Sequence, residues 1–313
     1  MTGLDRGAPC LSDSSVLLLD GGIGLELRRR MPDADTALLP ADALVAAPHV
    51  VRQVHADYIR SGAQVITTNT YATGPDRLAA LTEHAARWAE LVERACRLAA
   101  EAREASEKTV AIAGCLPPLH GSYRPENVRP HAEIAPVYRA FVEIMAPHVD
   151  LFLCETMSSA AEGFAAAEAA TASGKPVWVS WTVRDDRSGI LRSGETIRDA
   201  FAALKGLPVQ AVMANCAAPE SLTAAMPYLA ACGTVRVGGH ANGFVEVPEK
   251  WSVRDGISAL GRREDLDPSA YAGHAEDWLA AGASIIGGCC GVGPEHIACL
   301  DERLREVSVK AAS

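Results

Sequence analysis

The sequence predicts one α/β domain that folds as a (β/α)8 barrel of the TIM type. Eight short apolar segments recur along the 313 residues, and stretches rich in Ala, Glu and Arg with helical spacing separate them. Strands that alternate with helices are parallel and are covered on both faces, which explains segments that are apolar throughout. The length also agrees with a barrel of this class, which typically needs about 250 residues or somewhat more.

The expected strands are runs of β-branched or other apolar residues, and each ends in Gly, Asn, Asp, Cys, Thr or a similar rim residue. In chain order they are residues 16–22, 64–70, 110–115, 151–156, 177–183, 211–216, 235–242 and 284–290. Apolar runs of this length, bounded by turn residues, are typical of buried parallel strands.

The expected helices fill the intervals between these strands. The clearest helical pattern covers residues 75–107, where apolar side chains recur every three or four positions. Further helices are predicted at 158–173, 195–204, 219–232 and 268–282.

No linker rich in Pro, Gly and Ser divides the chain, so the barrel is expected to be one domain, residues 16–307. Tails are expected at 1–15 and 308–313. The segment 245–271 is long and contains no strand pattern. It is either a loop over the barrel mouth or a surface insertion away from it, and the sequence leaves both possibilities open.

An open doubly wound sheet is the alternative fold. The stretch GGIGLEL at 21–27 loosely resembles the glycine loop of dinucleotide-binding domains, but it lacks the third glycine of that loop. The barrel is therefore the favoured interpretation.

The charge and the composition indicate which classes of partner the protein does not bind. A net charge of −10 without a basic stripe argues against nucleic acid. The N-terminus lacks a signal-peptide pattern, and no apolar run approaches the ~18 residues of a membrane span. We therefore expect a cytoplasmic protein whose nine cysteines are free, metal-bound or catalytic. The oligomeric state is not indicated.

Polar residues collect where the predicted strands end, and in a barrel of this type these ends form the active face. They are Asp20, Thr68, Asn69, Thr70, Cys115, Glu155, Asn215, Cys216, Asn242, Cys289 and Cys290. Polar groups at this position are costly to bury without partners, so their concentration predicts a site.

The thiols of Cys216, Cys289 and Cys290 predict a zinc site. Adjacent cysteines rarely form a disulfide with each other, and the glycines around this pair allow a turn tight enough to present both sulfurs. Three thiolates suit Zn²⁺ and leave its fourth position open, as in catalytic zinc sites. The alternative is that these are small buried residues in glycine-rich turns. Cys154 is expected to pack in the core. Cys115 could line the pocket, although packing is the favoured interpretation.

The motifs LLLDGGIGLEL, ITTNTY, LFLCET, NC and GASIIGGCCGVGPEHI resemble those of the zinc-dependent homocysteine S-methyltransferases, from about residue 16 to residue 300. The resemblance implies methyl transfer to homocysteine, with zinc on the three cysteines named above. It also implies that Glu155 holds the homocysteine ammonium group. The remaining substrate-binding positions that it implies are Asp20, Gly21, Gly22, Thr68 and Asn215.

The methyl donor is expected to be a sulfonium, S-methylmethionine ahead of S-adenosylmethionine. Betaine is a quaternary ammonium that needs an aromatic cage, yet betaine-using relatives carry Tyr where this chain has Thr156. Only Tyr71 and Tyr123 are expected near the mouth. His240 departs from the family pattern and leaves the donor contacts open. The alternatives are a betaine-dependent or other thiol or selenol methyltransferase, a zinc hydrolase, and a non-catalytic zinc or redox protein.

Overall fold

The computed structural model describes residues 11, 15–34, 38–233, 235–248, 251 and 260–312. Eight parallel strands form its centre, in the ring order β1-β8-β7-β6-β5-β4-β3-β2. They are β1 (Leu17–Leu18), β2 (Val65–Thr67), β3 (Ala111–Leu116), β4 (Leu151–Met157), β5 (Val177–Trp181), β6 (Ala211–Asn215), β7 (Arg236–Ala241) and β8 (Ile285–Gly288). A parallel bridge between Leu19 and Val65 joins the first strand to the second and closes the barrel.

Every predicted strand is present, so the predicted barrel is confirmed and the doubly wound sheet is excluded. Most strands are shorter than their apolar runs. The run 16–22, for example, pairs as a strand only at Leu17–Leu18, although Leu19 still makes the closing bridge. Residues beyond the last ladder bond belong to the rim, where the chain turns toward the next helix.

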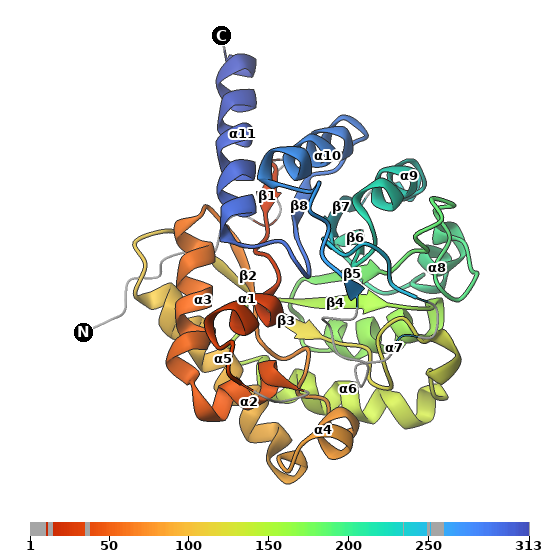
Figure 1. The fold of residues 1–313 in the computed structure, drawn as a ribbon. Coiled ribbons are helices and arrows are strands. Elements are labelled where there is room, and N and C mark those ends of the chain that lie inside the picture. The colour runs from red at the N-terminus through yellow and green to blue at the C-terminus, as the bar shows by residue number, and fades with distance from the viewer. Residues whose placement is uncertain are drawn as a thin grey trace.

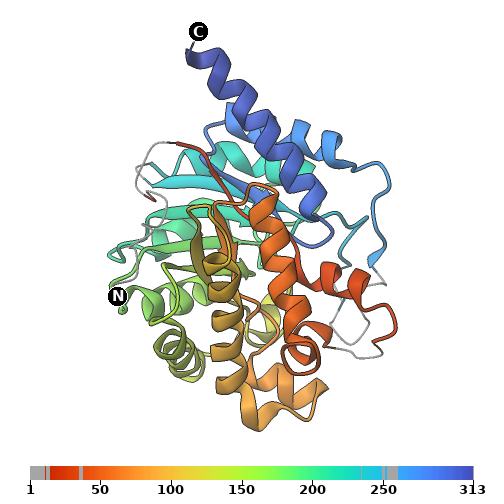
Figure 2. The ribbon, with the colours of Figure 1, turned by 90° about the vertical axis from the view of Figure 1, so that its left-hand side faces the viewer.

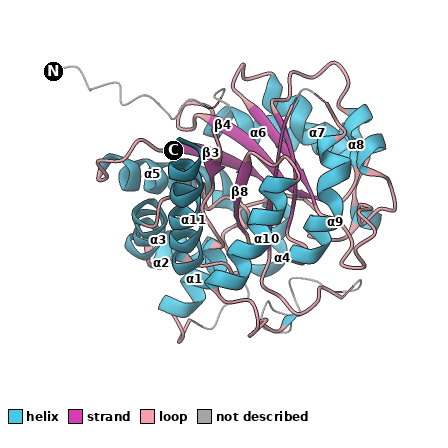
Figure 3. Ribbon diagram, turned by 90° about the horizontal axis from the view of Figure 1, so that it is seen from above, coloured by secondary structure: helices cyan, strands magenta, loops and turns pink. Residues whose placement is uncertain are grey.

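Helices surround the strands (Figures 1 and 3). They are α1 (Ile23–Arg30), α2 (Leu39–Ala46), α3 (Pro48–Arg60), α4 (Pro75–Leu81), α5 (Trp88–Glu104), α6 (His131–Met145), α7 (Ala160–Thr171), α8 (Ile197–Ala203), α9 (Pro219–Ala230), α10 (Pro268–Ala280) and α11 (Pro294–Ala312), with 3-10 turns η1 (Ala85–Arg87) and η2 (Pro125–Asn127). Helix α11 packs beside α3 and α10, and its C-terminal end projects beyond the barrel (Figures 1 and 2).

The helical pattern at 75–107 does not form a single helix. The segment forms α4, η1 and α5, because Thr82 adopts extended backbone angles after α4. The Thr82 hydroxyl accepts a hydrogen bond from the backbone N–H of His84. Such local side-chain bonds compete with the helix and let the chain turn, although the apolar spacing continues past the break.

Side chains alternate along the strands between two apolar layers. One layer fills the barrel interior and includes Leu17, Val65, Leu153 and Met213. The other lies between the strands and the helices and includes Trp181, whose neighbours in the chain point to the opposite face. Because the interior is packed, chemistry is restricted to the mouth.

The segments that the sequence assigned to tails are only partly described. Residues 1–10 and 12–14 lie outside the described residues, whereas α11 continues through residue 312. Of the segment 245–271, residues 249–250 and 252–259 also lie outside the description. Within the described part of the chain, no helix is long and apolar enough to cross a membrane.

His55 on α3 makes the stability of this fold pH-dependent. Its side chain is fully buried, and neither ring nitrogen has a hydrogen-bond partner among the described residues. Burial lowers the pKa of His55 from 6.5 to about 4. Between pH 6.5 and pH 4, the imidazole is therefore mostly neutral in the folded protein and mostly protonated in the unfolded chain. The stabilisation is complete above pH 6.5 and is lost as the pH falls toward 4.

When the pH falls from 7 to 5, the protonation of His55 in the unfolded chain should lower the free energy of unfolding by about 2 kcal/mol. Urea unfolding of the wild type and of His55→Leu at both pH values measures this difference. His49→Gln, an exposed position on the same helix, is the control. Equal pH dependence in wild type and His55→Leu would contradict the assignment.

Candidate metal centre and active site

Three thiols meet at the mouth of the barrel. Cys216 follows β6, and Cys289 and Cys290 follow β8. Their sulfur atoms all lie within 4.8 Å of one another, and the Sγ atoms of Cys216 and Cys289 are 2.7 Å apart. The structure thus brings together the three cysteines that the sequence singled out, from positions 73 residues apart.

Backbone contacts fix where these thiols lie. The N–H of Cys216 donates to the carbonyl of His240, and the N–H of Cys289 donates to the carbonyl of Ala241. Gly22 is required here, because a Cβ at this position would lie 2.6 Å from the carbonyl oxygen of Cys289. Gly291 has a φ of 83°, a value that glycine adopts without strain.

Several residues with a strained backbone conformation also lie at this mouth. Of the described residues other than glycine, four have positive φ, and three of them border the site: Tyr123, Thr156 and Cys216. Such conformations cost roughly 1–3 kcal/mol each and persist where the surrounding structure imposes them, often at active sites.

The electrostatics of the cluster favour a thiolate at Cys216. Hydrogen bonds from Cys289 and Cys290 hold the pKa of Cys216 well below its usual range, and the hydroxyl of Tyr123 donates to its sulfur at 3.1 Å. The pKa values of Cys289 and Cys290 are raised well above the usual range, first of all by their bonds to Cys216.

This donor set fits zinc. Three sulfurs converge on one point, and within the described chain no fourth His, Cys, Asp or Glu joins the group. Soft thiolates select zinc, and three protein ligands leave one tetrahedral position for a substrate atom. A closed site of four thiolates, as expected for a structural metal, finds no support among these residues.

Glu155 on β4 lies near the cluster. The thiol of Cys115, on neighbouring β3, donates to its Oε1 at 3.2 Å. Burial raises the pKa of Glu155 to about 8. A carboxyl group in such surroundings gains from a cationic partner that restores its charge. Of the two interpretations of Cys115, this contact supports the one in which its thiol lines the pocket.

Asp20 and Thr68 lie at the same mouth, at the ends of β1 and β2. The Asp20 carboxylate accepts hydrogen bonds from the backbone N–H and the hydroxyl of Thr67, at 2.7 and 2.9 Å. Burial nonetheless raises the pKa of Asp20 to about 7. The hydroxyl of Thr68 accepts from the N–H of Cys115 and shares a hydrogen bond with Thr70.

Asn215, the last residue of β6, supports the end of β4. Its Oδ1 accepts hydrogen bonds from the N–H of Thr156 and the hydroxyl of Ser180, and its Nδ2 donates to the hydroxyl of Thr156. These bonds hold Thr156 in its strained conformation and so orient the adjacent Glu155. Asn215 acts on the site through this contact.

An apolar cluster covers the thiols. Phe244, Val247, Trp251 and Leu260, from the segment after β7, pack with Tyr123 against Cys216. The rings of Tyr123 and Trp251 meet edge to face, with centroids 5.7 Å apart. Of the two open interpretations of 245–271, the described part favours the loop over the mouth. The aromatic residues of this cover have no regular spacing in the sequence, so the sequence does not identify them as part of the site.

His240, on β7, is buried, and its Nε2 lies 3.2 Å from the hydroxyl of Ser180. Burial lowers the pKa of His240 to about 4, so the imidazole is neutral. Its ring lies under the site as a neutral hydrogen-bonding group.

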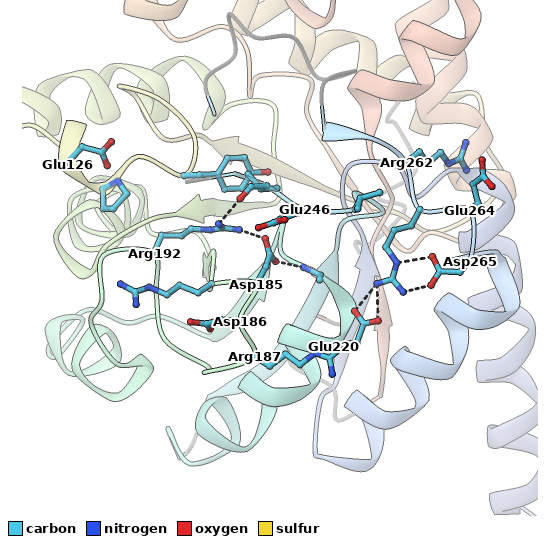
Figure 4. A pocket seen from close by; sticks show the side chains of 17 residues that line it. Glu126, Asp185, Asp186, Arg187, Arg192, Glu220, Glu246, Arg262, Glu264 and Asp265 are labelled. Atoms are coloured by element: carbon cyan, nitrogen blue, oxygen red, sulfur yellow. Dashed lines mark hydrogen bonds and ion pairs between the residues drawn. The ribbon is translucent and has the colours of Figure 1, made fainter. Parts of the chain in front are cut away.

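A cavity of about 1130 Å³ lies beside the cysteines, lined from the loops after β5, β6 and β7 and by residues 123–126 (Figure 4). Tyr123, which donates to Cys216, is part of its wall. The lining includes seven carboxylates and five arginines. The sequence does not indicate this cavity, because most of its charged residues lie in loops without a motif.

Comparisons with known proteins agree with this geometry. The family model for homocysteine S-methyltransferase matches residues 17–304. A homocysteine S-methyltransferase of Escherichia coli is 32% identical over 94% of this chain and 96% of its own length. The metallated form of the homocysteine methyltransferase MmuM from Escherichia coli superposes with a TM-score of 0.77 at 32% identity, over 94% of this chain and 98% of that one. An S-methylmethionine–homocysteine S-methyltransferase of Rattus norvegicus is 25% identical over 94% of this chain and 80% of its length.

Proposed function

Because this chain belongs to the homocysteine S-methyltransferase family, we propose that it transfers a methyl group from a sulfonium donor, S-methylmethionine first, to the thiolate of homocysteine. Zinc held by Cys216, Cys289 and Cys290 is the cofactor of this reaction. The observation that carries the proposal is the convergence of these three thiols within 4.8 Å at the barrel mouth. Likeness to the metallated Escherichia coli enzyme supports it.

The reaction balances without an oxidant or a further co-reactant. The homocysteine sulfur attacks the methyl carbon of S-methylmethionine, and a new S–CH3 bond forms as the old one breaks. The electron pair of the broken bond stays on the leaving sulfur, which becomes a neutral thioether. The products are two molecules of methionine and the proton that homocysteine loses.

Zinc bound to three thiolates would deprotonate the homocysteine thiol while leaving its sulfur electron-rich. The chain's own residues place the acceptor. Glu155 pairs with its ammonium group, and the mouth around Asp20, Gly21, Gly22 and Thr68 receives its carboxylate end. The apolar cover of Phe244 and Trp251 excludes water, which favours a step that neutralises an anionic sulfur and a cationic donor.

The proposed preference among methyl donors follows from the side chains that line the mouth. Thr156 is buried at the end of β4, and its side chain bonds to Asn215, so it supplies no aromatic face for betaine. S-adenosylmethionine would need an apolar slot for adenine, whereas the adjoining cavity is lined chiefly by charged residues. A small sulfonium amino acid fits this chemistry best. A selenol acceptor is the alternative closest to the same site.

A side-by-side assay tests the donor. With homocysteine as acceptor and equal concentrations of S-methylmethionine, S-adenosylmethionine and betaine, we expect methionine to form fastest from S-methylmethionine. Methyl-labelled donors identify the source of the transferred group by mass spectrometry. Faster turnover with betaine would overturn the donor assignment, and no turnover with any of the three would overturn the proposed reaction.

A further inference from the structure

The cavity beside Cys216 is lined chiefly from the second half of the barrel. Asp20, Thr68 and Glu155 come from β1, β2 and β4, whereas most of the cavity is lined by the loops after β5, β6 and β7, and Tyr123, Pro125 and Glu126 from the loop after β3 complete it. Methyl transfer needs the attacking and the leaving sulfur on opposite sides of the methyl carbon. An acceptor held by the first half of the barrel thus places the donor toward the second half, where the cavity is.

Arg192 connects this cavity to the thiols. Its guanidinium carbon lies 5.1 Å from the centre of the Tyr123 ring, and the hydroxyl of Tyr123 donates to the sulfur of Cys216. One tyrosine side chain therefore separates the arginine from the sulfur of Cys216. A donor that lies along this tyrosine can present its sulfonium near the thiols and its far end near Arg192.

Arg192 has donors to spare. Its side chain is only 9% exposed. Nη2 donates to Asp185 at 2.8 Å, and Nη1 donates to the carbonyl of Val247 at 3.4 Å (Figure 4). Its buried Nε has no hydrogen-bond partner among the described residues. Two of the five N–H donors of the guanidinium are thus used, and a buried donor without a partner costs about 1–3 kcal/mol.

Asp185 holds this arginine in place. Its Oδ2 accepts from Arg192, and its Oδ1 accepts from the backbone N–H of Ala218, two residues after Cys216. The guanidinium is therefore fixed relative to the metal centre before any ligand binds. A planar group of this kind matches a carboxylate.

We propose that this cavity binds the amino-acid end of the sulfonium donor and that Arg192 receives the donor's carboxylate. The remaining carboxylates of the lining, Asp186 and Glu246 among them, attract the donor's ammonium and sulfonium charges. The inference rests on the proposed function for the identity of the donor, and it names the residue that selects a donor with a carboxylate.

The test compares S-methylmethionine with (3-aminopropyl)dimethylsulfonium, which lacks only the carboxylate. A lost charge-assisted hydrogen bond corresponds to roughly a ten- to hundredfold change. We therefore expect Arg192→Gln to lower kcat/KM for S-methylmethionine ten- to hundredfold, through KM for the donor. The KM for homocysteine and the rate with the decarboxylated donor should stay unchanged. Arg192→Lys should restore part of the loss, and Arg198→Gln, exposed on α8, is the control.

Titration calorimetry of both donors into the same proteins separates this inference from the proposed function. Binding of S-methylmethionine that depends on Arg192 but leads to no turnover supports the subsite and overturns the reaction. Turnover that does not depend on Arg192 overturns the subsite alone. An equal loss for both donors would show that Arg192 supports Tyr123 structurally, and absence of S-methylmethionine binding to the wild type would also overturn the subsite.

Discussion

Replacing Cys289 by alanine should abolish the zinc binding that we propose and lower methyl transfer by about a thousandfold or more, since a metal ion contributes several kcal/mol at such a site. The reason is geometric. Among the described residues, Cys289 is one of three sulfurs that converge, and two thiolates cannot hold the ion in the open tetrahedral arrangement. Metal content by mass spectrometry and methionine formation are measured on the same preparation.

Cys299→Ala, on α11 and remote from the thiols, is the matched control and should keep both zinc and activity. The same loss is expected for Cys216→Ala and Cys290→Ala. If the protein that lacks all three thiols retained one zinc per chain, the metal centre would lie elsewhere.

Glu155→Gln should raise the KM for homocysteine ten- to hundredfold, because the amide keeps the shape of the carboxyl group but removes the charge that pairs with the ammonium. Metal content should stay unchanged, since Glu155 is not part of the cysteine group. Initial rates with varied homocysteine at saturating donor give this KM.

Glu143→Gln, an exposed residue on α6, controls for the change of net charge. A second comparison uses 4-mercaptobutanoate, which is homocysteine without its amino group and whose KM should not respond to Glu155→Gln. An unchanged KM for homocysteine in Glu155→Gln would remove this residue from the acceptor site.

The strands and the thiols could be predicted because both depend on local patterns. Buried parallel strands need continuous apolar runs, and their carboxyl ends converge at one face whatever the helices do. Cys216 and the Cys289–Cys290 pair follow such runs directly, so their meeting follows from the order of the strands.

The wall of the site could not be predicted in the same way. The contact of Cys115 with Glu155 depends on the register of two neighbouring strands, in which Cys115 pairs with Leu153. Arg192 and Asp185 lie in the loop after β5, where no periodicity fixes direction, and the contact of Arg192 with Tyr123 joins this loop to the loop after β3. The break after α4 could not be predicted either, because the apolar spacing continues through Thr82. The break depends on a local hydrogen bond from the backbone N–H of His84 to the Thr82 hydroxyl.

X-ray absorption at the zinc edge tests the central claim most directly, which is that the three thiols hold a zinc ion whose open position takes the homocysteine sulfur. For the protein alone we expect three sulfur neighbours at about 2.3 Å and one lighter atom. Addition of homocysteine should replace the lighter atom with a fourth sulfur, and Cys289→Ala should show no zinc at all. Four sulfurs before homocysteine is added, or a spectrum that homocysteine leaves unchanged, would contradict the account.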